Sequence, residues 1–550
     1  MVEEKYDGYK LKTMLYEGAR ALSHSKSSID ALNVFPVPDG DTGTNMDLTL
    51  QAACKEIEKL TSNDLREISN AFATGSLMGA RGNSGVILSQ LIRGFSKAFE
   101  KRQVFDAYVF AEGLVNGVNT AYKSVLKPVE GTMLTVAKDS ALGAQKYLKK
   151  TKTPSLEEIL KEVIKSGEKS LEETPEKLKV LKEAGVVDAG GMGLVVIYKG
   201  FLNGMEKTFM EAKSDLAKSN VLDANQRDTS SIEGSKGSGY KYCTELIVKG
   251  ENLDEDSLKS ELMPLGDSLL VVGSKDLIKI HIHTDRPGLV LDRCCNVGEL
   301  SDVKIDNMKE QHAEFINKDK SSSQEVNLKA KDIIEVVSIA NGQGFKDIFE
   351  SMGVSKVIFG GQSMNPSTED VFNAVEDISA NKVIILPNNK NIIMSCKQVK
   401  DLTQKEVQVV ETTTVPQGFA ALLEFDPEAD DIDKEKEKME DNKEDVVTAQ
   451  ITYAIRGTIV NGIQVDEGSI IGVVEDEIIY SGKNIDEVVC QTLYEAVDKD
   501  KEIISIFAGE DVTEEESKSL KEKVSEKFED LEIELYKGGQ PLYYYIFSIE

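Results

Sequence analysis

The stretch Asn33-Val-Phe-Pro-Val-Pro-Asp39-Gly-Asp41-Thr-Gly-Thr44-Asn45 is the most informative segment of this chain. Asp39 and Asp41 lie two residues apart, so an extended turn points both carboxylates to one side. Such oxygen ligands suit Mg²⁺, which usually shares them with the phosphates of a substrate. An apolar periodicity that opens at Thr44 and Asn45 predicts a helix, and helix N-termini bind phosphate groups. The segment therefore indicates a site for a metal-bound polyphosphate, although a bare Asp-Gly-Asp is also common in ordinary turns and helix caps.

The composition indicates how many domains to expect and which partners are disfavoured. The chain has 550 residues, which suggests about three domains, and a formal net charge of −30. Such an acidic protein should repel nucleic acid and anionic membrane surfaces. No run of about 18 apolar residues is present, so we expect no transmembrane segment. The charged N-terminus lacks a signal-peptide core and the cysteines are sparse, so we expect a cytoplasmic protein with reduced thiols.

Hydrophobic periodicity divides the chain into three parts joined by polar linkers. The first part reads as almost wholly helical, the middle part as a small α/β domain, and the last part as alternating strands and helices that form a parallel sheet. The predicted boundaries are 1–210 for the helical domain, 211–239 for a linker, 240–316 for the middle domain, 317–331 for a second linker and 332–550 for the C-terminal domain.

Glycine-rich loops recur before the predicted helices. In Gly79-Ala-Arg-Gly-Asn83-Ser84-Gly85, backbone amides and the Ser84 hydroxyl suit phosphate oxygens, although an ordinary helix–helix turn is an equally good interpretation. Gly131-Thr132-Met133 and Asp188-Ala-Gly190-Gly191 are weaker loops of the same kind. The chain has no Walker A motif and no His-Arg-Asp loop, which excludes P-loop enzymes and protein kinases by motif.

The run from Pro36 to Met46 resembles the signature of the dihydroxyacetone kinase L-subunit family, as found in the fatty acid kinase A subunit. The four loops occur in the order seen in that family, over about residues 6–205. The resemblance implies an all-α helical barrel that holds ATP at one end, with Mg²⁺ on Asp39 and Asp41. Asn33 is the nearest candidate for the third aspartate of the related enzymes, and it would coordinate the ion through a neutral carbonyl oxygen.

The same resemblance implies the contacts to the nucleotide. Its phosphates would lie near the aspartate loop and the Gly-Asn-Ser-Gly loop, and the two later loops would border and close the site. The implied cofactor-binding residues are Thr42, Thr44, Asn45, Asn83, Ser84, Gly131, Thr132, Met133, Asp188 and Gly190.

The middle domain contains a second candidate site. His281-Ile-His283 on a predicted strand places both imidazoles on one face, and Cys243 opens another predicted strand. One cysteine and two histidines can bind Zn²⁺ with an open fourth position, or form a nucleophile–base set. Ordinary polar strand residues are an equally good interpretation. Residues 242–290 resemble the middle domain of the fatty acid kinase A subunit, which implies that Cys243, His281 and His283 act in phosphotransfer.

The C-terminal region carries Gly342-Gln-Gly344 and Gly360-Gly-Gln-Ser-Met-Asn-Pro-Ser367 directly after predicted strands. Loops at the carboxyl ends of parallel strands commonly bind ligands, although two such loops are weak evidence. This region resembles the C-terminal domain of the same fatty acid kinase family, whose fold is similar to DegV-type fatty-acid-binding proteins. The resemblance implies a surface that docks the partner carrying the fatty acid.

Taken together, the resemblance implies the ATP-dependent catalytic subunit of a fatty acid kinase. It would phosphorylate the carboxylate of a fatty acid presented by a separate DegV-type binding protein, giving an acyl phosphate for phospholipid synthesis. Two alternatives stay open: a dihydroxyacetone (glycerone)-type kinase, and a non-catalytic nucleotide-binding regulatory protein. The expected cofactors are ATP and Mg²⁺, with Zn²⁺ in the middle domain and a homodimer as further options.

Overall fold

The structure is a computed structural model that describes residues 4–33, 40–125, 127–213, 216, 242–250, 255–273, 277–295, 297–307, 333–360, 365–460, 462–498 and 500–550. The chain forms two compact units, which are described separately below. One unit combines Met1–Gln226 with Ala330–Glu550, and the other is Arg227–Lys329. The predicted linkers at 211–239 and 317–331 lie largely outside the described residues, and the predicted domain boundaries stay predictions.

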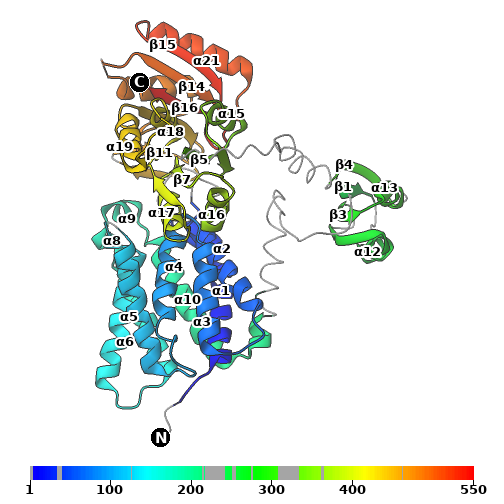
Figure 1. Cartoon of the computed structure of the whole chain (residues 1–550), viewed down its shortest axis with the longest axis vertical. Coiled ribbons are helices and arrows are strands. Elements are labelled where there is room, and N and C mark those ends of the chain that lie inside the picture. Colours follow the sequence, from blue (N-terminus) through cyan, green and yellow to red (C-terminus); the bar gives the residue numbers. More distant parts are fainter. Residues whose placement is uncertain are drawn as a thin grey trace. The chain divides into compact units, whose positions relative to one another are not determined.

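The N-terminal part of the first unit is built from helices, as predicted. Figure 1 shows them in blue, cyan and green, with the long helices running alongside one another. Their bounds are α1 (Gly8–Asp30), α2 (Thr42–Glu58), α3 (Leu65–Met78), α4 (Gly82–Ser96), α5 (Ala107–Ser124), α6 (Met133–Lys150), α7 (Leu156–Glu172), α8 (Thr174–Lys177), α9 (Lys179–Ala184) and α10 (Ala189–Glu206).

Polar side chains set where several of these helices begin. Asp7, Asp64, Asp106 and Ser155 are the N-cap residues of α1, α3, α5 and α7, and each accepts a hydrogen bond from a backbone amide in the first turn. These amides have no partner within the helix itself, so the caps fix the helix starts. The N-termini of α2, α4 and α6 are built differently and belong to the candidate site below.

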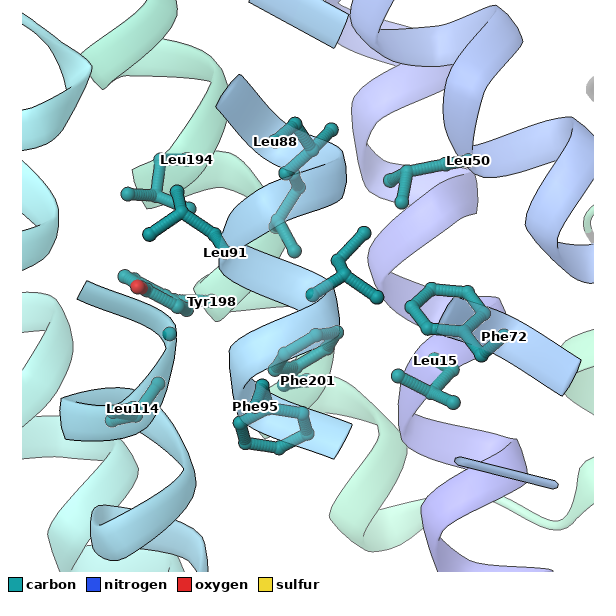
Figure 2. Close-up of a pocket in the computed structure, with 13 residues that line it drawn as sticks. Leu15, Leu50, Phe72, Leu88, Leu91, Phe95, Leu114, Leu194, Tyr198 and Phe201 are labelled. Atoms are coloured by element: carbon teal, nitrogen blue, oxygen red, sulfur yellow. The ribbon is translucent and has the colours of Figure 1, made fainter. Parts of the chain in front are cut away.

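Leucine and phenylalanine side chains fill the centre of the helical part. Figure 2 shows them converging from several helices around a small cavity of about 50 Å³. Residues that line it include Leu15 of α1, Leu50 of α2, Leu88 and Phe95 of α4, and Phe201 of α10. A cavity this apolar stays dry, so it marks the core rather than a polar binding site.

Helices α1 and α10 approach one another backbone to backbone. A Cβ atom added at Gly200 would lie 2.5 Å from the carbonyl oxygen of Glu17 and 2.6 Å from Cα of Gly18. One turn further along, a Cβ at Gly204 would lie 2.7 Å from Cα of Met14. Only glycine fits at these two positions, so the two helices pack with their backbones in contact.

The C-terminal part of the same unit contains two sheets with helices, and it confirms the predicted α/β class. The first sheet is parallel with strand order β6-β5-β7-β8. Its elements are β5 (Ile334–Ala340), α15 (Gln343–Ser351), β6 (Lys356–Phe359), α16 (Thr368–Glu376), β7 (Lys382–Leu386), α17 (Ile393–Lys400), β8 (Glu406–Val409), α18 (Val415–Leu422) and α19 (Ile432–Lys443).

The second sheet of this part is mixed, with strand order β13-β12-β9-β16-β14-β15. Its elements, together with a separate β10–β11 hairpin, are β9 (Val447–Tyr453), β10 (Thr458–Val460), β11 (Ile463–Val465), β12 (Ile470–Val474), β13 (Glu477–Gly482), α20 (Ile485–Ala496), β14 (Ile503–Ala508), α21 (Glu514–Lys527), β15 (Glu532–Lys537) and β16 (Tyr545–Ile549). Loops at the carboxyl edge of the parallel sheet contact the helical part, through Asn365 after β6 and Asn391 after β7.

The second unit is a small α/β domain with a four-stranded antiparallel sheet in the order β2-β3-β1-β4. Isoleucines 278, 280 and 282 of β3 are buried in one core cluster with residues of helix α13. The elements are β1 (Tyr242–Lys249), α12 (Glu255–Leu262), η1 (Met263–Leu265), β2 (Gly266–Gly273), β3 (Leu277–Thr284), α13 (Pro287–Cys295) and β4 (Glu299–Asn307). In the part of the chain that the structure describes, none of the helices combines the length and apolar composition that a membrane crossing requires.

The close approach of α1 and α10 yields a stability prediction. In Gly204→Ala, the new methyl group meets the backbone of Met14, which has no room to move aside. We expect a loss of about 1–3 kcal/mol from overpacking, despite the higher helix propensity of alanine. Thermal unfolding followed by circular dichroism measures this. Asn203→Ala, at an exposed position of the same helix, is the control. Equal melting temperatures for the two variants would contradict the backbone contact.

Candidate active site

The aspartate loop leads into α2, and the first turn of this helix is held by Asp30, a residue that no sequence motif indicated. Asp30, the last residue of α1, accepts hydrogen bonds from the backbone amides of Gly43 at 2.6 Å and Thr44 at 3.1 Å. The hydroxyl of Thr44 donates to the other carboxylate oxygen at 2.8 Å. Burial raises the pKa of Asp30, while the bonds from Thr44 and Gly43 oppose that shift. Asp30 therefore caps α2 from outside the helix.

Because Asp30 caps α2, the side chain of Asp41 is available for a different contact. Asp41 is the N-cap residue of α2 by position, but its side chain makes no capping hydrogen bond. Its carboxylate instead accepts a hydrogen bond from Nδ2 of Asn365 at 2.5 Å. Asn33 is described and lies beside Gly40, whereas Asp39 lies outside the described residues. The metal-binding roles of Asn33, Asp39 and Asp41 stay predictions.

The four predicted loops converge on one cavity of about 170 Å³. Most of the predicted nucleotide-binding residues line it, although they come from segments far apart in the sequence. The lining residues are Leu32, Asn33, Thr42, Asn83, Ser84, Ile87, Thr132, Met133, Leu181, Asp188, Ala189 and Gly190. Ser84 Oγ donates to Thr42 Oγ1 at 3.4 Å, which links the first turns of α2 and α4.

Three other predicted residues support the loops and do not appear among the residues that line the cavity. Thr44 is bonded to Asp30, as described above. Asn45 is buried, and its side chain lies so close to Gly82 that a Cβ there would come within 2.6 Å of Asn45 Nδ2. Gly131 has a φ of +87° in the turn before α6, and its amide donates to Thr135 Oγ1 at 2.8 Å. These three residues shape the walls of the site.

Four helices begin at this cavity: α2, α4, α6 and α10. The N-cap residues of α4 and α6, Arg81 and Thr132, make no side-chain capping bond. Among the described residues, Arg81 thus leaves the first-turn amides of α4 uncapped, whereas the amide of Met133 at the start of α6 bonds to Asp188. The helix dipoles add positive potential. Such a place suits the oxygens of an anion with several phosphates.

Asp188 is the one titratable side chain among the described residues that line the cavity. It caps α10 by accepting a hydrogen bond from the amide of Gly191 at 2.7 Å. Burial raises the pKa of Asp188 to about 6, although backbone bonds from Gly191 and Met133 act in the opposite direction. A carboxyl group in this state sits partly protonated near neutral pH.

The second candidate site falls on paired strands of the other unit. In the antiparallel register of β1 and β3, Cys243 lies opposite His283, and Glu245 lies opposite His281. The backbone thus brings Cys243, His281 and His283 onto neighbouring strands. Their side chains lie outside what the structure describes. Among the described residues, no group of three His, Cys, Asp or Glu side chains could hold a metal ion, so Zn²⁺ stays a prediction.

Comparisons with known proteins cover nearly the whole chain. Residues 36–203 match the DAK2 domain, residues 239–315 match the middle domain of the fatty acid kinase A-like family, and residues 335–550 match the C-terminal domain of that family. Protein YloV of Bacillus subtilis is 42% identical over 554 residues, covering 99% of both chains. Uncharacterized protein SSP1546 of Staphylococcus saprophyticus is 39% identical over 552 residues, covering 99% of this chain and 100% of that protein.

Two solved structures show partial likeness. The dihydroxyacetone kinase from C. freundii, in complex with AMP-PNP and Mg²⁺, has a TM-score of 0.28 and 18% identity, over 35% of this chain and 33% of that one. DegV, a fatty acid binding protein from Bacillus subtilis, has a TM-score of 0.31 and 13% identity, over 40% of this chain and 98% of that one.

The burial of Asp188 predicts a pH-dependent stability effect. Because its pKa in the folded state is about 6, above the ordinary value of 3.8, the folded protein favours the protonated form. The resulting stability is present at low pH and is lost as the pH rises through about 6. Asp188→Asn keeps a capping side chain but cannot ionise. We therefore expect the variant to gain about 1 kcal/mol relative to the unmodified protein between pH 5 and pH 8.

Thermal unfolding at several pH values measures this difference. Asp106→Asn, which changes the N-cap of α5 away from the cavity, controls for the general effect of replacing a capping aspartate. A gap between Asp188→Asn and the unmodified protein that stays constant from pH 5 to pH 8 would refute the buried carboxyl group.

Proposed function

The chain belongs to the fatty acid kinase A-like family, and we propose that it is the ATP-dependent subunit that phosphorylates the carboxylate of a fatty acid. In this proposal a separate DegV-type binding protein presents the fatty acid, and the product is an acyl phosphate. The family membership itself identifies the chain as a kinase. We further propose that the acceptor is a fatty acid, that the partner is a DegV-type protein, and that the cofactors are ATP and Mg²⁺.

The observation that carries the proposal is the cavity where four helices begin. The first-turn amides of α4, and those of α6 other than the Met133 amide that bonds to Asp188, suit the phosphates of a nucleotide. The residues at these helix starts also fit a hard cation. The Asp41 carboxylate lies at the start of α2, and Asn83 Oδ1 is buried without a hydrogen-bond partner among the described residues. Asp39, Asp41 and Asn33 would hold Mg²⁺. The bound ion would neutralise charge on the transferring phosphoryl group.

The chemistry of the cavity favours a carboxylate as the acceptor. A fatty acid carboxylate is ionised near neutral pH and attacks phosphorus without losing a proton. A hydroxyl acceptor, such as that of dihydroxyacetone, has to release a proton during the transfer. Asp188 is the one titratable side chain among the described lining residues, and its carboxylate is already engaged by the amide of Gly191. The site therefore supports positioning and charge neutralisation better than proton removal.

The proposal assigns the middle unit to the acceptor side of the reaction. Cys243, His281 and His283 are the residues we propose for phosphotransfer there, as nucleophile and base, as Zn²⁺ ligands or as groups that orient the acyl carboxylate. Their place on paired strands β1 and β3 supports a joint role, because opposite residues in an antiparallel pair are close in space.

The proposal predicts that the unmodified chain forms acyl phosphate and that one substitution, Asp41→Ala, lowers the rate. The purified chain, mixed with ATP, Mg²⁺ and an oleate-loaded DegV-type protein, should form acyl phosphate that hydroxylamine traps as a hydroxamate. Asp41→Ala should lower this rate at least about a hundredfold, the scale for losing a group that stabilises charge in the transition state. Asp106→Ala removes a different helix cap of the same helical part, so it should lower the melting temperature and leave the rate nearly unchanged.

Two results would favour the rival functions. Equal or faster phosphorylation of dihydroxyacetone, with no hydroxamate from oleate, would identify a glycerone-type kinase. Tight nucleotide binding without turnover of either acceptor would identify a regulatory protein. Unimpaired hydroxamate formation by Asp41→Ala would refute the metal assignment.

A further inference from the structure

The loop that follows β6 reaches the candidate active site from the C-terminal part of the chain. Ser367 forms an antiparallel bridge with Arg81, and the amide of Thr368 donates to the carbonyl oxygen of Ala80 at 3.0 Å. Arg81 in turn donates from Nη1 to the backbone oxygen of Asn365 at 2.8 Å. These three contacts fix residues 365–368 against the turn that begins α4.

The side chain of Asn365 is thereby held beside the aspartate loop. Asn365 is only 2% exposed, and its Nδ2 donates to Oδ2 of Asp41 at 2.5 Å. Its Oδ1 is buried and has no hydrogen-bond partner within the described parts of the chain. A buried amide oxygen left without a partner costs about 1–3 kcal/mol, so native proteins rarely keep one without a reason. A ligand or a bound water would satisfy this oxygen.

We propose that Asn365 is a positioning residue of the cation–phosphate site. Its Nδ2 orients the carboxylate of Asp41, and its Oδ1 supplies a neutral oxygen to the cation, directly or through a bound water. This inference rests on the proposed function, because it takes Asp41 to be a ligand of Mg²⁺. Carboxylates that bind metals are themselves commonly hydrogen-bonded, and such second partners tune metal affinity.

An amide is chemically well suited to this place. Together with Asp39, for which the family resemblance implies a place in the same site, Asp41 would contribute two negative charges, and the nucleotide would bring several more. A third carboxylate facing Asp41 would add repulsion, whereas an asparagine adds one oxygen ligand and one hydrogen-bond donor without any charge. Asn365 thus strengthens the site without raising its negative charge.

Gly82 packs closely against Asn45 and Asn365 beside the contact between Asn365 and Asp41. Gly82 has a φ of +55°, and a Cβ added there would lie 2.6 Å from Asn45 Nδ2 and 3.4 Å from Asn365 Nδ2. A second loop of the same sheet edge, after β7, also reaches the site, because Asn83 Nδ2 donates to Oδ1 of Asn391 at 3.4 Å. The carboxyl edge of the parallel sheet therefore contributes to the kinase site at two places.

The first experiment measures how tightly the full chain binds a metal ion, independently of catalytic turnover. Mn²⁺ serves as the probe, with ADP present, and its binding is followed by electron paramagnetic resonance. Asn365→Ala should weaken Mn²⁺ binding by about 10–100-fold, the range for losing a partner of a metal ligand. Arg456→Ala is the matched control, since Arg456 makes another hydrogen bond between the same two parts of the chain, to the Ala31 carbonyl at 2.9 Å. This control should leave Mn²⁺ affinity within about threefold.

A second variant separates a metal-linked role from a purely structural one. Asn365→Asp places a carboxylate against Asp41, so the metal-free variant should melt at a lower temperature than the unmodified protein. Mn²⁺ alone should then raise its melting temperature more than it raises that of the unmodified protein, because the ion neutralises both carboxylates. A residue with only a structural role would show no such metal-dependent recovery.

The outcomes distinguish this inference from the function on which it rests. If Asp41→Ala loses Mn²⁺ affinity while Asn365→Ala keeps it, the role of Asn365 is overturned and the metal assignment stands. If Asp41→Ala also keeps full affinity, the metal assignment fails and the inference fails with it. If Asn365→Ala unfolds, the Mn²⁺ response of Asn365→Asp decides, and the absence of an enhanced response overturns the inference.

Discussion

Four helices begin at one end of the N-terminal bundle, and the amides of their first turns need partners there. Asp30 accepts amide bonds at the start of α2, and Asp188 accepts them from Gly191 of α10 and Met133 of α6. Among the described residues, Arg81 makes no capping bond at the start of α4. The remaining positive potential is available to an anion. This constraint accounts for the small residues in the converging loops, because bulky side chains would block access to the amides.

The convergence of the four loops followed from the resemblance to the dihydroxyacetone kinase L-subunit family, since each loop alone is a weak signal. Glycines and hydroxyl or amide side chains at helix starts indicate phosphate binding wherever the helices lie. Asp30 was not predictable, since it looks like any acidic residue at the end of a helix, and only the fold shows that it turns back onto α2. Asn365 stands in a glycine-rich loop after a strand, which indicated a ligand site of some kind. Its partner Asp41 is 324 residues away, and no local pattern reports a contact over that separation.

The net charge of −30 at first disfavours a polyanionic ligand. Binding depends on the local field, however, and fixed amide dipoles act within the first turn of a helix. A divalent cation between carboxylates and phosphates reverses the local sign. In its proposed role, Asn365 would add a ligand oxygen without further repulsion. The overall acidity therefore bears on solubility and on excluded partners, while the site is governed by its own few groups.

The first compact unit is assembled from both ends of the chain, with residues 227–329 inserted between them. On the ribosome, Asp41 emerges 324 residues before Asn365. At ordinary elongation rates of about 5–20 residues per second, roughly 15–65 seconds separate the two. During that interval the nascent helical part has its phosphate-facing amides but lacks Asn365. The order of translation thus delays the contact between Asp41 and Asn365 until the C-terminal part of the chain has been made.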